Sequence, residues 1–493
     1  MMAENILNYL ENTVASYPDK TAIAMDDRSY SFAELKDLSS RLACAIPVKG
    51  QNKPIPVLVE RDIDTLVLFL AVLYSGNFYV PVDCDSPIAK INDIIYDSGA
   101  EIILGSENTR ALCEQLDFRG SFITMKDITD TEADMPVCEA DTPLYMVYTS
   151  GSTGKPKGVL KGHGGMISFI EAYCDTFGFS TDEVIGNQTP FYFDASAKDI
   201  YLMLKTGATM EVIPTKHFSM PALLIEYLNQ RKVTMISWVP TALAIVVALK
   251  TFKSIMPQTL KRVFFVGEVM PTKVLNGWME YLPELQYVNL FGSSEIAGIS
   301  TYYEINKQFA NDESLPIGKP LKNCKIYLMD GDKLITEPGH KGEIYVASDA
   351  LALEYYHDPE KTSACFMNRD FGDGECRCFK TGDLAQYDSE GNLVFASRCD
   401  FQIKHMGHRI ELGEIETALN AVPFLRKACC LFNADSKKIV CFYEADAECK
   451  KEIIAEISKK LPKYMWPNIF KLYEALPLNK NGKIDRVKLK EDL

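Results

Sequence analysis

Residues 148–159 read YTSGSTGKPKGV and hold three glycines, two serines, two threonines and two lysines. Backbone amides of a segment without bulky side chains can turn inward around an anion, and hydroxyl and ammonium groups add donors and positive charge. The apolar run at residues 143–148 is expected to be a strand, and a second apolar segment begins at Val159. The stretch therefore predicts a phosphate-binding loop.

The spacing of this loop differs from that of the P-loop of nucleoside triphosphatases. That motif has four residues between its glycines and a Ser or Thr directly after its lysine. Here two residues separate Gly151 from Gly154, and Pro156 follows Lys155. Judged by itself, the stretch has a second interpretation as a solvated, flexible loop.

The composition indicates a globular protein of two or more domains. The chain has 493 residues, 47% of them hydrophobic, and a mean hydropathy of -0.07. The formal net charge of -15 argues against a nucleic-acid partner and against an anionic membrane surface. We find no signal peptide, and apolar runs such as residues 67–74 are shorter than the roughly 20 residues that cross a bilayer. The fourteen cysteines lack zinc-site spacing, so we expect reduced thiols in a cytoplasmic protein without membrane insertion.

Strand and helix patterns alternate along the first three hundred residues, which predicts an α/β fold with mainly parallel sheets. Ser31 and Glu34 have the spacing of a capping box, so a helix is expected from there to about Ala45. The other expected helices are residues 64–74 and 87–96, and the expected strands are residues 55–59, 101–104 and 262–266.

Near residue 400 the pattern changes to a small α+β unit. We expect strands at residues 392–396, 429–432 and 439–443 and helices at residues 414–421 and 451–461. About ninety residues suffice for a small domain. We place the boundary at Asp400, which gives domains of residues 1–399 and 400–493.

Eight motifs in register resemble those of the adenylate-forming enzymes, which include acyl-CoA synthetases, luciferases and the amino-acid-activating domains of nonribosomal peptide synthesis. Besides the loop, they are LYSGNFYVPVD (73–83), FDAS (193–196), FGSSE (291–295), GEIYV (342–346), KTGDL (380–384), SRCDFQIKHMGHRIELGEIE (397–416) and NGKIDR (481–486). The resemblance covers almost the whole chain. It implies a large α/β domain with a small barrel-like part, followed by a small mobile C-terminal domain.

The resemblance implies a reaction of a carboxylate with ATP that gives an acyl-adenylate and pyrophosphate. Positioning and charge neutralisation dominate such a reaction, because two negative species must be brought together. In this family the loop holds the β- and γ-phosphates, the KTGDL aspartate binds the ribose, and the FGSSE phenylalanine stacks on adenine. The implied nucleotide-binding residues are Thr149, Ser150, Gly151, Ser152, Thr153, Gly154, Lys155, Lys157, Gly267, Glu268, Asn289, Phe291, Gly292, Ser294, Asp383 and Arg398.

Lys483 of NGKIDR matches the family's catalytic lysine, whose ammonium bridges the attacking carboxylate and the α-phosphate. By composition alone it would be an exposed lysine of a basic C-terminal stretch. Asp400 matches the hinge about which the small domain rotates after adenylation. The resemblance implies that Lys483 then leaves and that the loop at Gly407 enters to guide a pantetheine thiol. Asp383 also fits a turn aspartate, and Arg398 a surface ion pair.

Glu295 matches the residue that helps to hold Mg²⁺, an ion that prefers carboxylate, phosphate and water oxygens. The motif FGSSE departs from YGPTE, the usual pattern of peptide synthesis. Phe291 retains a ring for stacking, and Ser294 retains a hydroxyl group.

Asp194 matches the residue that pairs with the substrate ammonium in amino-acid-activating members, so an amino acid is the expected substrate; its alternative is a helix cap. Lys198 would meet a substrate carboxylate or polar group if it points inward, and would leave a small apolar pocket if it points outward. The expected substrate pocket consists of Asp194, Ala195, Lys198, Ser237, Phe264, Val266, Leu290, Gly298 and Ile299.

The length of the chain and its motif sequences are most similar to those of stand-alone D-alanine–carrier-protein ligases, although Val266 stands where those usually have cysteine. Because no carrier-type attachment motif is visible, we expect a phosphopantetheinylated carrier protein to act in trans. Two alternatives remain: a CoA ligase for a small carboxylic acid, and an inactive nucleotide-binding regulator.

Overall fold

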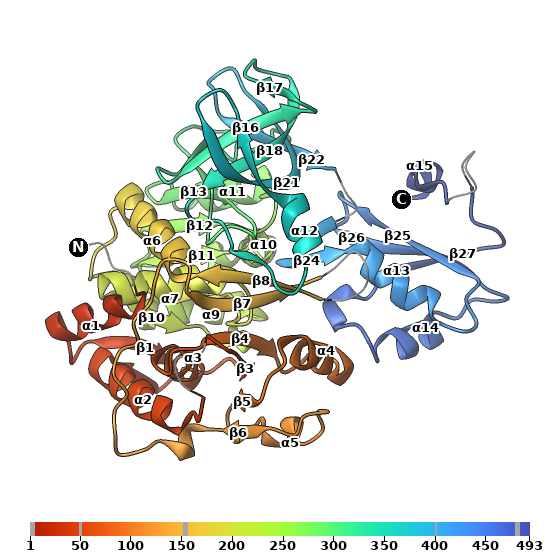
Figure 1. Ribbon diagram of the computed structural model, residues 1–493. Helices are drawn as coiled ribbons and strands as arrows, with labels where there is room; N and C mark the ends of the chain where they lie inside the picture. The colour runs from red at the N-terminus through yellow and green to blue at the C-terminus, as the bar shows by residue number, and fades with distance from the viewer. Residues whose placement is uncertain (1–4, 49–51, 151–155, 400–401, 479–483) are drawn as a thin grey trace.

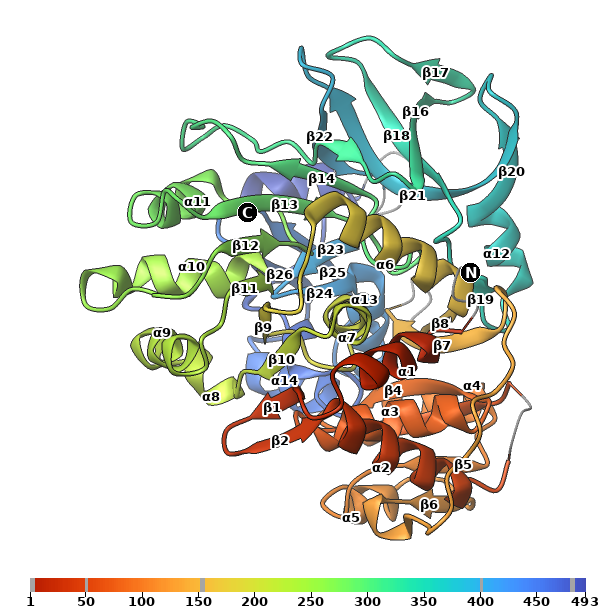
Figure 2. The ribbon, with the colours of Figure 1, turned by 90° about the vertical axis from the view of Figure 1, so that its left-hand side faces the viewer.

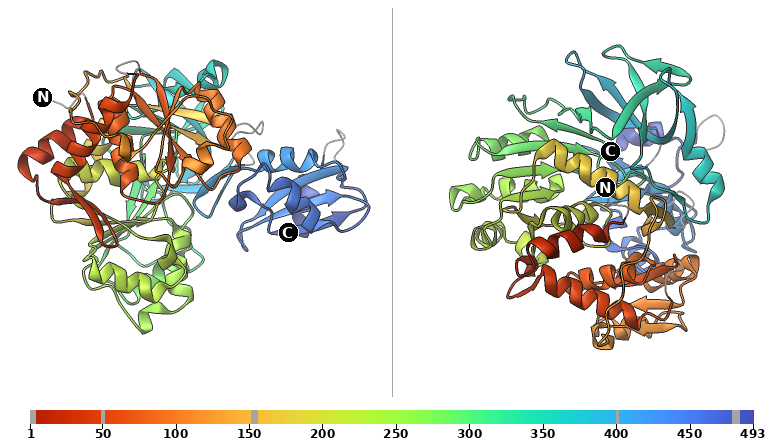
Figure 3. Two further views of the ribbon diagram at one scale, coloured as in Figure 1. Left: turned by 90° about the horizontal axis from the view of Figure 1, so that it is seen from below. Right: turned by 60° about the vertical axis from the view of Figure 1, so that its left-hand side comes forward.

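The computed structural model describes residues 5–48, 52–150, 156–399, 402–478 and 484–493. Its N-terminal part is an α/β structure with layers of sheet and helix, and its C-terminal segments form a separate lobe to one side (Figures 1 and 3). The expected α/β class is confirmed. Among the described residues, none of the helices combines the length and the apolar character that a membrane span requires.

The first sheet is mainly parallel and carries antiparallel strands at both edges. Parallel strands buried on both faces read as short apolar runs, as Val263 to Phe265 do. In spatial order the strands are β15 (Lys319–Pro320), β14 (Thr301–Glu304), β13 (Gln286–Phe291), β12 (Arg262–Phe265), β11 (Met235–Trp238), β9 (Val184–Asn187), β10 (Thr209–Val212), β1 (Thr21–Met25) and β2 (Arg28–Ser31).

The second sheet contains the two strands that flank the phosphate loop. Strands β7 and β8 are antiparallel neighbours, whereas β4, β3, β5 and β6 run parallel to β7. In spatial order the strands are β19 (Glu354–Tyr355), β8 (Lys157–Gly162), β7 (Pro143–Thr149), β4 (Phe78–Asp83), β3 (Pro54–Val59), β5 (Ile102–Leu104) and β6 (Ser121–Ile123).

Helices cover these two sheets, as the turned view shows (Figure 2). Residues 65–74 are buried all round, so this helix lies inside the fold. The helices of the N-terminal part are α1 (Leu7–Ser16), α2 (Phe32–Ala45), α3 (Asp64–Tyr74), α4 (Ile88–Ser98), α5 (Arg110–Cys113), α6 (His163–Phe177), α7 (Ala195–Thr206), α8 (Thr215–Phe218), α9 (Pro221–Gln230), α10 (Pro240–Ala248), α11 (Thr272–Met279) and α12 (Pro359–Cys365), with 3₁₀ turns η1 (Met125–Asp127) and η2 (Thr251–Lys253).

A third, antiparallel sheet lies above the first two in Figure 1 and takes the place of the expected barrel-like part. Its longest strand, β21, pairs with three others and carries Asp383, which lines the site described below. The strands are β17 (Lys333–Ile335), β16 (Cys324–Asp330), β18 (Lys341–Ser348), β21 (Glu375–Tyr387), β20 (Phe366–Asp370) and β22 (Leu393–Arg398).

The C-terminal lobe has its own buried cores, built around residues such as Ile415 and Cys441 on one side of its sheet and Leu431 and Phe442 on the other. A hairpin precedes that sheet and reaches back to the large domain. The elements are β23 (Gln402–His405), β24 (His408–Glu411), α13 (Leu412–Asn420), β25 (Lys427–Asn433), β26 (Lys438–Glu444), α14 (Lys450–Ile457), β27 (Ile469–Tyr473) and α15 (Arg486–Leu489), with η3 (Lys463–Met465) and η4 (Lys490–Asp492).

Several local expectations match the structure closely. The Ser31 hydroxyl accepts from the Glu34 amide and the Glu34 carboxylate accepts from the Ser31 amide, so the capping box is present. The helix expected at residues 64–74 has those bounds. The helix expected at residues 451–461 is shorter and ends at Ile457. The domain boundary stays a prediction, because Asp400 lies outside the described residues.

Candidate active site

A cavity of about 280 Å³ lies where several strands of the large domain end. Its wall on that side comes from Thr149 at the end of β7 and Ser150 directly after it, Thr189 after β9 and Gly267 after β12. The β23–β24 hairpin of the C-terminal lobe forms the opposite wall. Ligands of open α/β sheets bind beyond the carboxyl ends of the strands, so this central cavity is the candidate site.

The expected phosphate loop connects two antiparallel strands. Thr149 ends β7 and stands opposite Lys157, the first residue of β8. The predicted residues Gly151, Ser152, Thr153, Gly154 and Lys155 lie outside the described part of the chain. The hydroxyl oxygen of Thr149 is buried and has no hydrogen-bond partner among the described residues. Thr149, at the start of the loop, therefore places at the cavity a hydroxyl group that has no partner among the described residues.

Ser150 joins the loop to the C-terminal hairpin. Its hydroxyl donates to the carbonyl oxygen of Arg409 at 2.9 Å and accepts from the amide of Glu411 at 3.1 Å. The side chain that was expected to bind phosphate is thus occupied by the backbone of β24 in this arrangement of the two domains.

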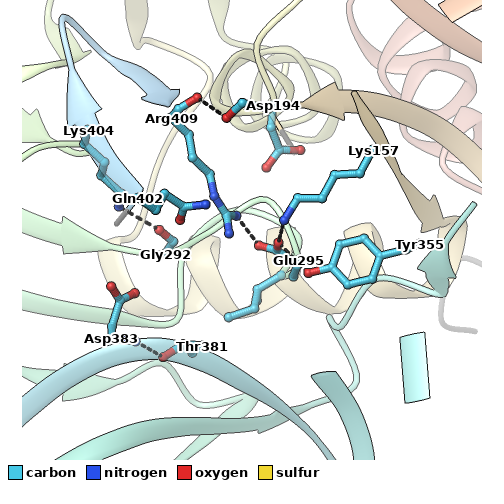
Figure 4. Close-up of polar contacts among 12 residues, drawn as sticks. Lys157, Asp194, Gly292, Glu295, Tyr355, Thr381, Asp383, Gln402, Lys404 and Arg409 are labelled. Atoms are coloured by element: carbon cyan, nitrogen blue, oxygen red, sulfur yellow. Dashed lines mark hydrogen bonds and ion pairs between the residues drawn. The ribbon is translucent and has the colours of Figure 1, made fainter. Parts of the chain in front are cut away.

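Glu295 is buried at the centre of a cluster of cations, seen in Figure 4. Its carboxylate accepts from the Arg409 guanidinium at 2.5 Å and from the Tyr355 hydroxyl at 2.7 Å, and the Lys157 ammonium lies at 3.6 Å. Burial would raise the pKa of Glu295, but Arg409 and Lys157 outweigh it and hold that pKa well below its ordinary value. Arg409 was missed as a site residue, because its partner lies 114 residues away in sequence.

Asp383 and Arg398 form an ion pair at the edge of the central cavity. They stand opposite each other on β21 and β22, and the guanidinium nitrogen lies 2.6 Å from the carboxylate oxygen. Arg398 also donates to the carbonyl oxygen of Thr381 at 3.3 Å. Both side chains are largely buried, which argues against the alternatives of a surface ion pair and a simple turn aspartate.

Lys404 is a further cation of the site that the sequence analysis did not single out. Its ammonium lies 5.5 Å from the ring centroid of Phe291. It also lies 3.5 Å from the carbonyl oxygen of Gly292 (Figure 4). Burial lowers the pKa of Lys404, and Asp383 opposes this shift. The sequence signal for Lys404 was the alternation of side chains along residues 402–411, because every second side chain of a strand lies on the same face.

A second cavity, of about 850 Å³, adjoins the first and shares Asp383, Arg398 and Lys404 with it. Its size and its mixture of apolar and polar walls suit a ring system with hydroxyl groups. Phe395 and Ile317 add apolar wall. The predicted nucleotide residues that line it are Gly267, Glu268, Asn289 and Phe291, whereas Gly292 and Ser294 line the central cavity.

Asp194 directly precedes α7 but does not cap it with its side chain. Its carboxylate accepts from the Tyr145 hydroxyl at 2.8 Å and forms an ion pair with Lys161 at 3.1 Å. Burial raises the pKa of Asp194, and Lys161 and Tyr145 oppose that shift. Asp194 lines the central cavity, so the helix-cap alternative is wrong, while ammonium binding stays a prediction.

Lys198 forms a buried ion pair with the adjacent Asp199, which also accepts from the side-chain amide of Asn187 at 3.0 Å. Neither expected orientation describes this arrangement, because the protein itself neutralises the ammonium. Lys198 lines neither of the two cavities.

The rest of the expected substrate pocket divides into two groups. Ala195, Val266 and Gly298 line the central cavity, and Leu290 lines the second one. A β-carbon on Gly298 would come within 2.2 Å of the Phe169 ring, so the residue is required to be small. The others are buried and line neither cavity: Ser237, Phe264 and Ile299.

The β23–β24 hairpin is held in the site by contacts along its length. Its turn has Met406 and Gly407 at φ values of 52° and 79°, as a two-residue turn with both centres left-handed requires. The Gly407 amide donates to the carboxylate of Glu268 at 2.8 Å, and the His408 ring lies 4.5 Å from that of Phe193. The predicted Gly407 loop is therefore at the site in this arrangement.

Lys483, the predicted catalytic lysine, and the predicted hinge residue Asp400 lie outside the described residues. Ile484, which follows Lys483, packs against the face of the β25–β27 sheet formed by residues such as Leu431 and Phe442. The roles of Lys483 and Asp400 remain predictions.

Comparison with known proteins identifies the family. Residues 10–356 match the family model of AMP-binding enzymes, and residues 414–483 match that of the AMP-binding enzyme C-terminal domain. The D-alanine--D-alanyl carrier protein ligase of Bacillus cytotoxicus is 31% identical over 504 residues, which cover 98% of each chain.

Tyrocidine synthase 1 of Brevibacillus parabrevis is 29% identical over 99% of this chain, and the match covers 45% of the synthase. The chain thus spans less than half the length of the synthases it matches. NpsA-ThdA, an artificially fused adenylation-PCP di-domain NRPS from Klebsiella oxytoca, has the same fold, with a TM-score of 0.84, 22% identity, and coverage of 96% of this chain and 94% of that one. The chain belongs to the AMP-binding enzyme family.

Proposed function

We propose that the protein activates an amino acid as its aminoacyl-adenylate, with release of pyrophosphate, and transfers it to the phosphopantetheine thiol of a carrier protein. The observation that carries the proposal is the convergence of Asp194, the Asp383–Arg398 pair and the start of the phosphate loop on one cavity. These reactants require a carboxylate that binds an amine, a second carboxylate that binds a diol, and hydrogen-bond donors that bind phosphates.

ATP is the proposed nucleotide. Thr149 and Ser293 line the central cavity with buried hydroxyl groups that have no partner among the described residues, and such groups suit phosphate oxygens. Asp383 would accept from the ribose hydroxyls, and the ring of Phe291 would stack on adenine. Lys157 would supply positive charge beside the phosphates.

Mg²⁺ does not fit Glu295 in this arrangement of the domains. The charge of its carboxylate is already balanced by Arg409 and Lys157, and its two oxygens accept from Arg409 and Tyr355. Coordination of a metal would first require Arg409 to leave with the hairpin, so we assign no step of the reaction to the ion. Glu295 remains the proposed magnesium ligand for the arrangement in which the hairpin is withdrawn.

In the first half-reaction the substrate carboxylate attacks the α-phosphorus and the bond to the β-phosphate oxygen breaks, so that pyrophosphate leaves. Lys483 would stabilise the charge that develops between the two reactants. Rotation about Asp400 would then bring in the hairpin, and the docked position of Gly407 supports this second arrangement. The carrier's thiol would attack the acyl carbon there and release AMP.

A CoA ligase for a small carboxylic acid is the second candidate. The ion pair of Lys161 with Asp194 favours it, since the carboxylate is already compensated when a substrate brings no ammonium. Both candidates suit a cytoplasmic enzyme, because all fourteen cysteines are free.

Amino-acid-dependent exchange of pyrophosphate into ATP tests the proposal. We expect exchange with at least one of the common amino acids or D-alanine, followed by thioester formation on holo-carrier protein. Exchange only with acids that lack an amine, and thioester formation only with CoA, would establish the second candidate. Absence of exchange with every acid would indicate an inactive nucleotide-binding regulator.

The pH dependence of this exchange follows from Lys157. Burial and the nearby Arg409 lower the pKa of Lys157 to about 8, although Glu295 opposes the shift. Only the protonated side chain attracts phosphates, and kcat/KM reports the free enzyme. For free enzyme with the hairpin docked as in this structure, kcat/KM for ATP should therefore fall as the pH rises above about 8, approaching about tenfold per pH unit. Lys157→Arg should abolish the fall, because a guanidinium stays protonated. An identical profile for both proteins would contradict this role.

A further inference from the structure

Lys161 is a buried cation in an otherwise apolar part of β8. Its side chain is 1% exposed, and it stands directly opposite Tyr145 of β7 in the antiparallel register. The ammonium also lies 5.7 Å from the centroid of the Tyr145 ring. A fully buried lysine is rare in proteins unless a partner balances its charge.

Asp194 is that partner. The Lys161 ammonium lies 3.1 Å from one carboxylate oxygen of Asp194 and 3.3 Å from the other, and it donates to the carbonyl oxygen of Ile296 at 2.9 Å. These contacts include hydrogen bonds to the Asp194 carboxylate and to the Ile296 carbonyl oxygen. Tyr145 donates to Asp194 as well. The carboxylate expected to attract a substrate ammonium is thus neutralised within the protein.

The pair leaves Asp194 able to accept one more hydrogen bond, since each carboxylate oxygen has two lone pairs. An incoming ammonium, however, would meet a carboxylate whose charge is balanced, and it would lie close to a second positive charge. Two like charges that both lie next to the same buried carboxylate repel each other strongly. The ammonium of a substrate therefore gains less here than it would at an unpaired aspartate.

We propose that Lys161 is a specificity-determining residue that weakens the preference of the site for an acid carrying an ammonium group over the same acid without it. The inference rests on the proposed function and deepens it. It predicts that the site recognises its substrate mainly by the carboxylate and the side chain, and that the amine contributes little to binding.

The test compares two acids by pyrophosphate exchange: the amino acid that the unaltered protein prefers, and the acid with hydrogen in place of its amine. Lys161→Met removes the charge, and Lys161→Gln removes it but keeps a donor for Asp194 and Ile296, so that folding is retained. For both variants we expect KM for the amino acid to fall about tenfold relative to that for the analogue. We expect kcat to change less than KM, as for a change in ground-state binding.

The matched control is Lys205→Met, which breaks the partly exposed ion pair with Glu171 at the other end of α7 and should leave the ratio unchanged. Thermal unfolding reports whether each variant is folded. A ratio that stays constant in folded Lys161→Gln overturns this inference alone and leaves the proposed function standing. Absence of exchange with either acid in the unaltered protein overturns both.

Discussion

Lys483→Ala is expected to slow adenylate formation by about 10²- to 10³-fold, which is the effect of removing one group that stabilises developing charge. The ammonium is proposed to act between the substrate carboxylate and the α-phosphate. Transfer of the acyl group from a preformed adenylate to the carrier thiol should keep its rate, because in the proposed rotation Lys483 leaves the site before this step. Single-turnover measurements of the two half-reactions separate these effects.

Lys488→Ala is the control for this variant, since Lys488 belongs to the same basic stretch and is exposed. It should leave both half-reactions unchanged if the position of Lys483, rather than the overall positive charge of this stretch, causes the effect. Equal losses of both half-reactions in Lys483→Ala would contradict the proposed domain rotation.

Gly407→Val should slow thiol transfer and spare adenylate formation, which is the opposite of the effect expected for Lys483→Ala. A β-carbon at Gly407 would lie 3.1 Å from a methyl carbon of Val239, and the residue has a φ of 79°, which β-branched side chains tolerate poorly. Because the hairpin then docks imperfectly, we expect thiol transfer to fall by roughly 10²-fold, as for a displacement of about 1 Å at a reacting centre. Adenylate formation should continue, since the hairpin is proposed to be withdrawn during that step.

Gly391→Val provides a close control for backbone strain. Gly391 has a φ of 80°, but a β-carbon there meets nothing within 4 Å. This variant should lose stability without a selective loss of thiol transfer. If Gly391→Val and Gly407→Val lose the same activities, strain alone explains the result and the docking of the hairpin is not the cause.

Local signals in the sequence predicted the fold well where a few neighbouring residues decide the structure. The reciprocal hydrogen bonds of Ser31 and Glu34 are an example, because both partners lie within one turn of helix. The β23–β24 hairpin was missed because its strands are only four residues long, and the apolar positions around Ile410 and Leu412 also suit the start of a helix.

The contacts within the site were harder to predict. Motif resemblance placed Asp194, Asp383 and Glu295 in one site, but it gave no information on their partners. Lys161 follows Val159 and Leu160 in a strand that reads as apolar. Only the register with β7 and the position of Asp194 reveal the ion pair, and both depend on contacts between distant parts of the chain.

The double role of the Ser150 hydroxyl has a consequence for timing. The group has a single proton, which goes to the main chain of Arg409 while the hairpin is docked. In the proposed reaction the same proton is given to a phosphate oxygen while nucleotide is bound. Because one proton cannot serve both contacts, we expect the hairpin to dock only after pyrophosphate has left. Ser150 would then delay entry of the thiol until the adenylate has formed.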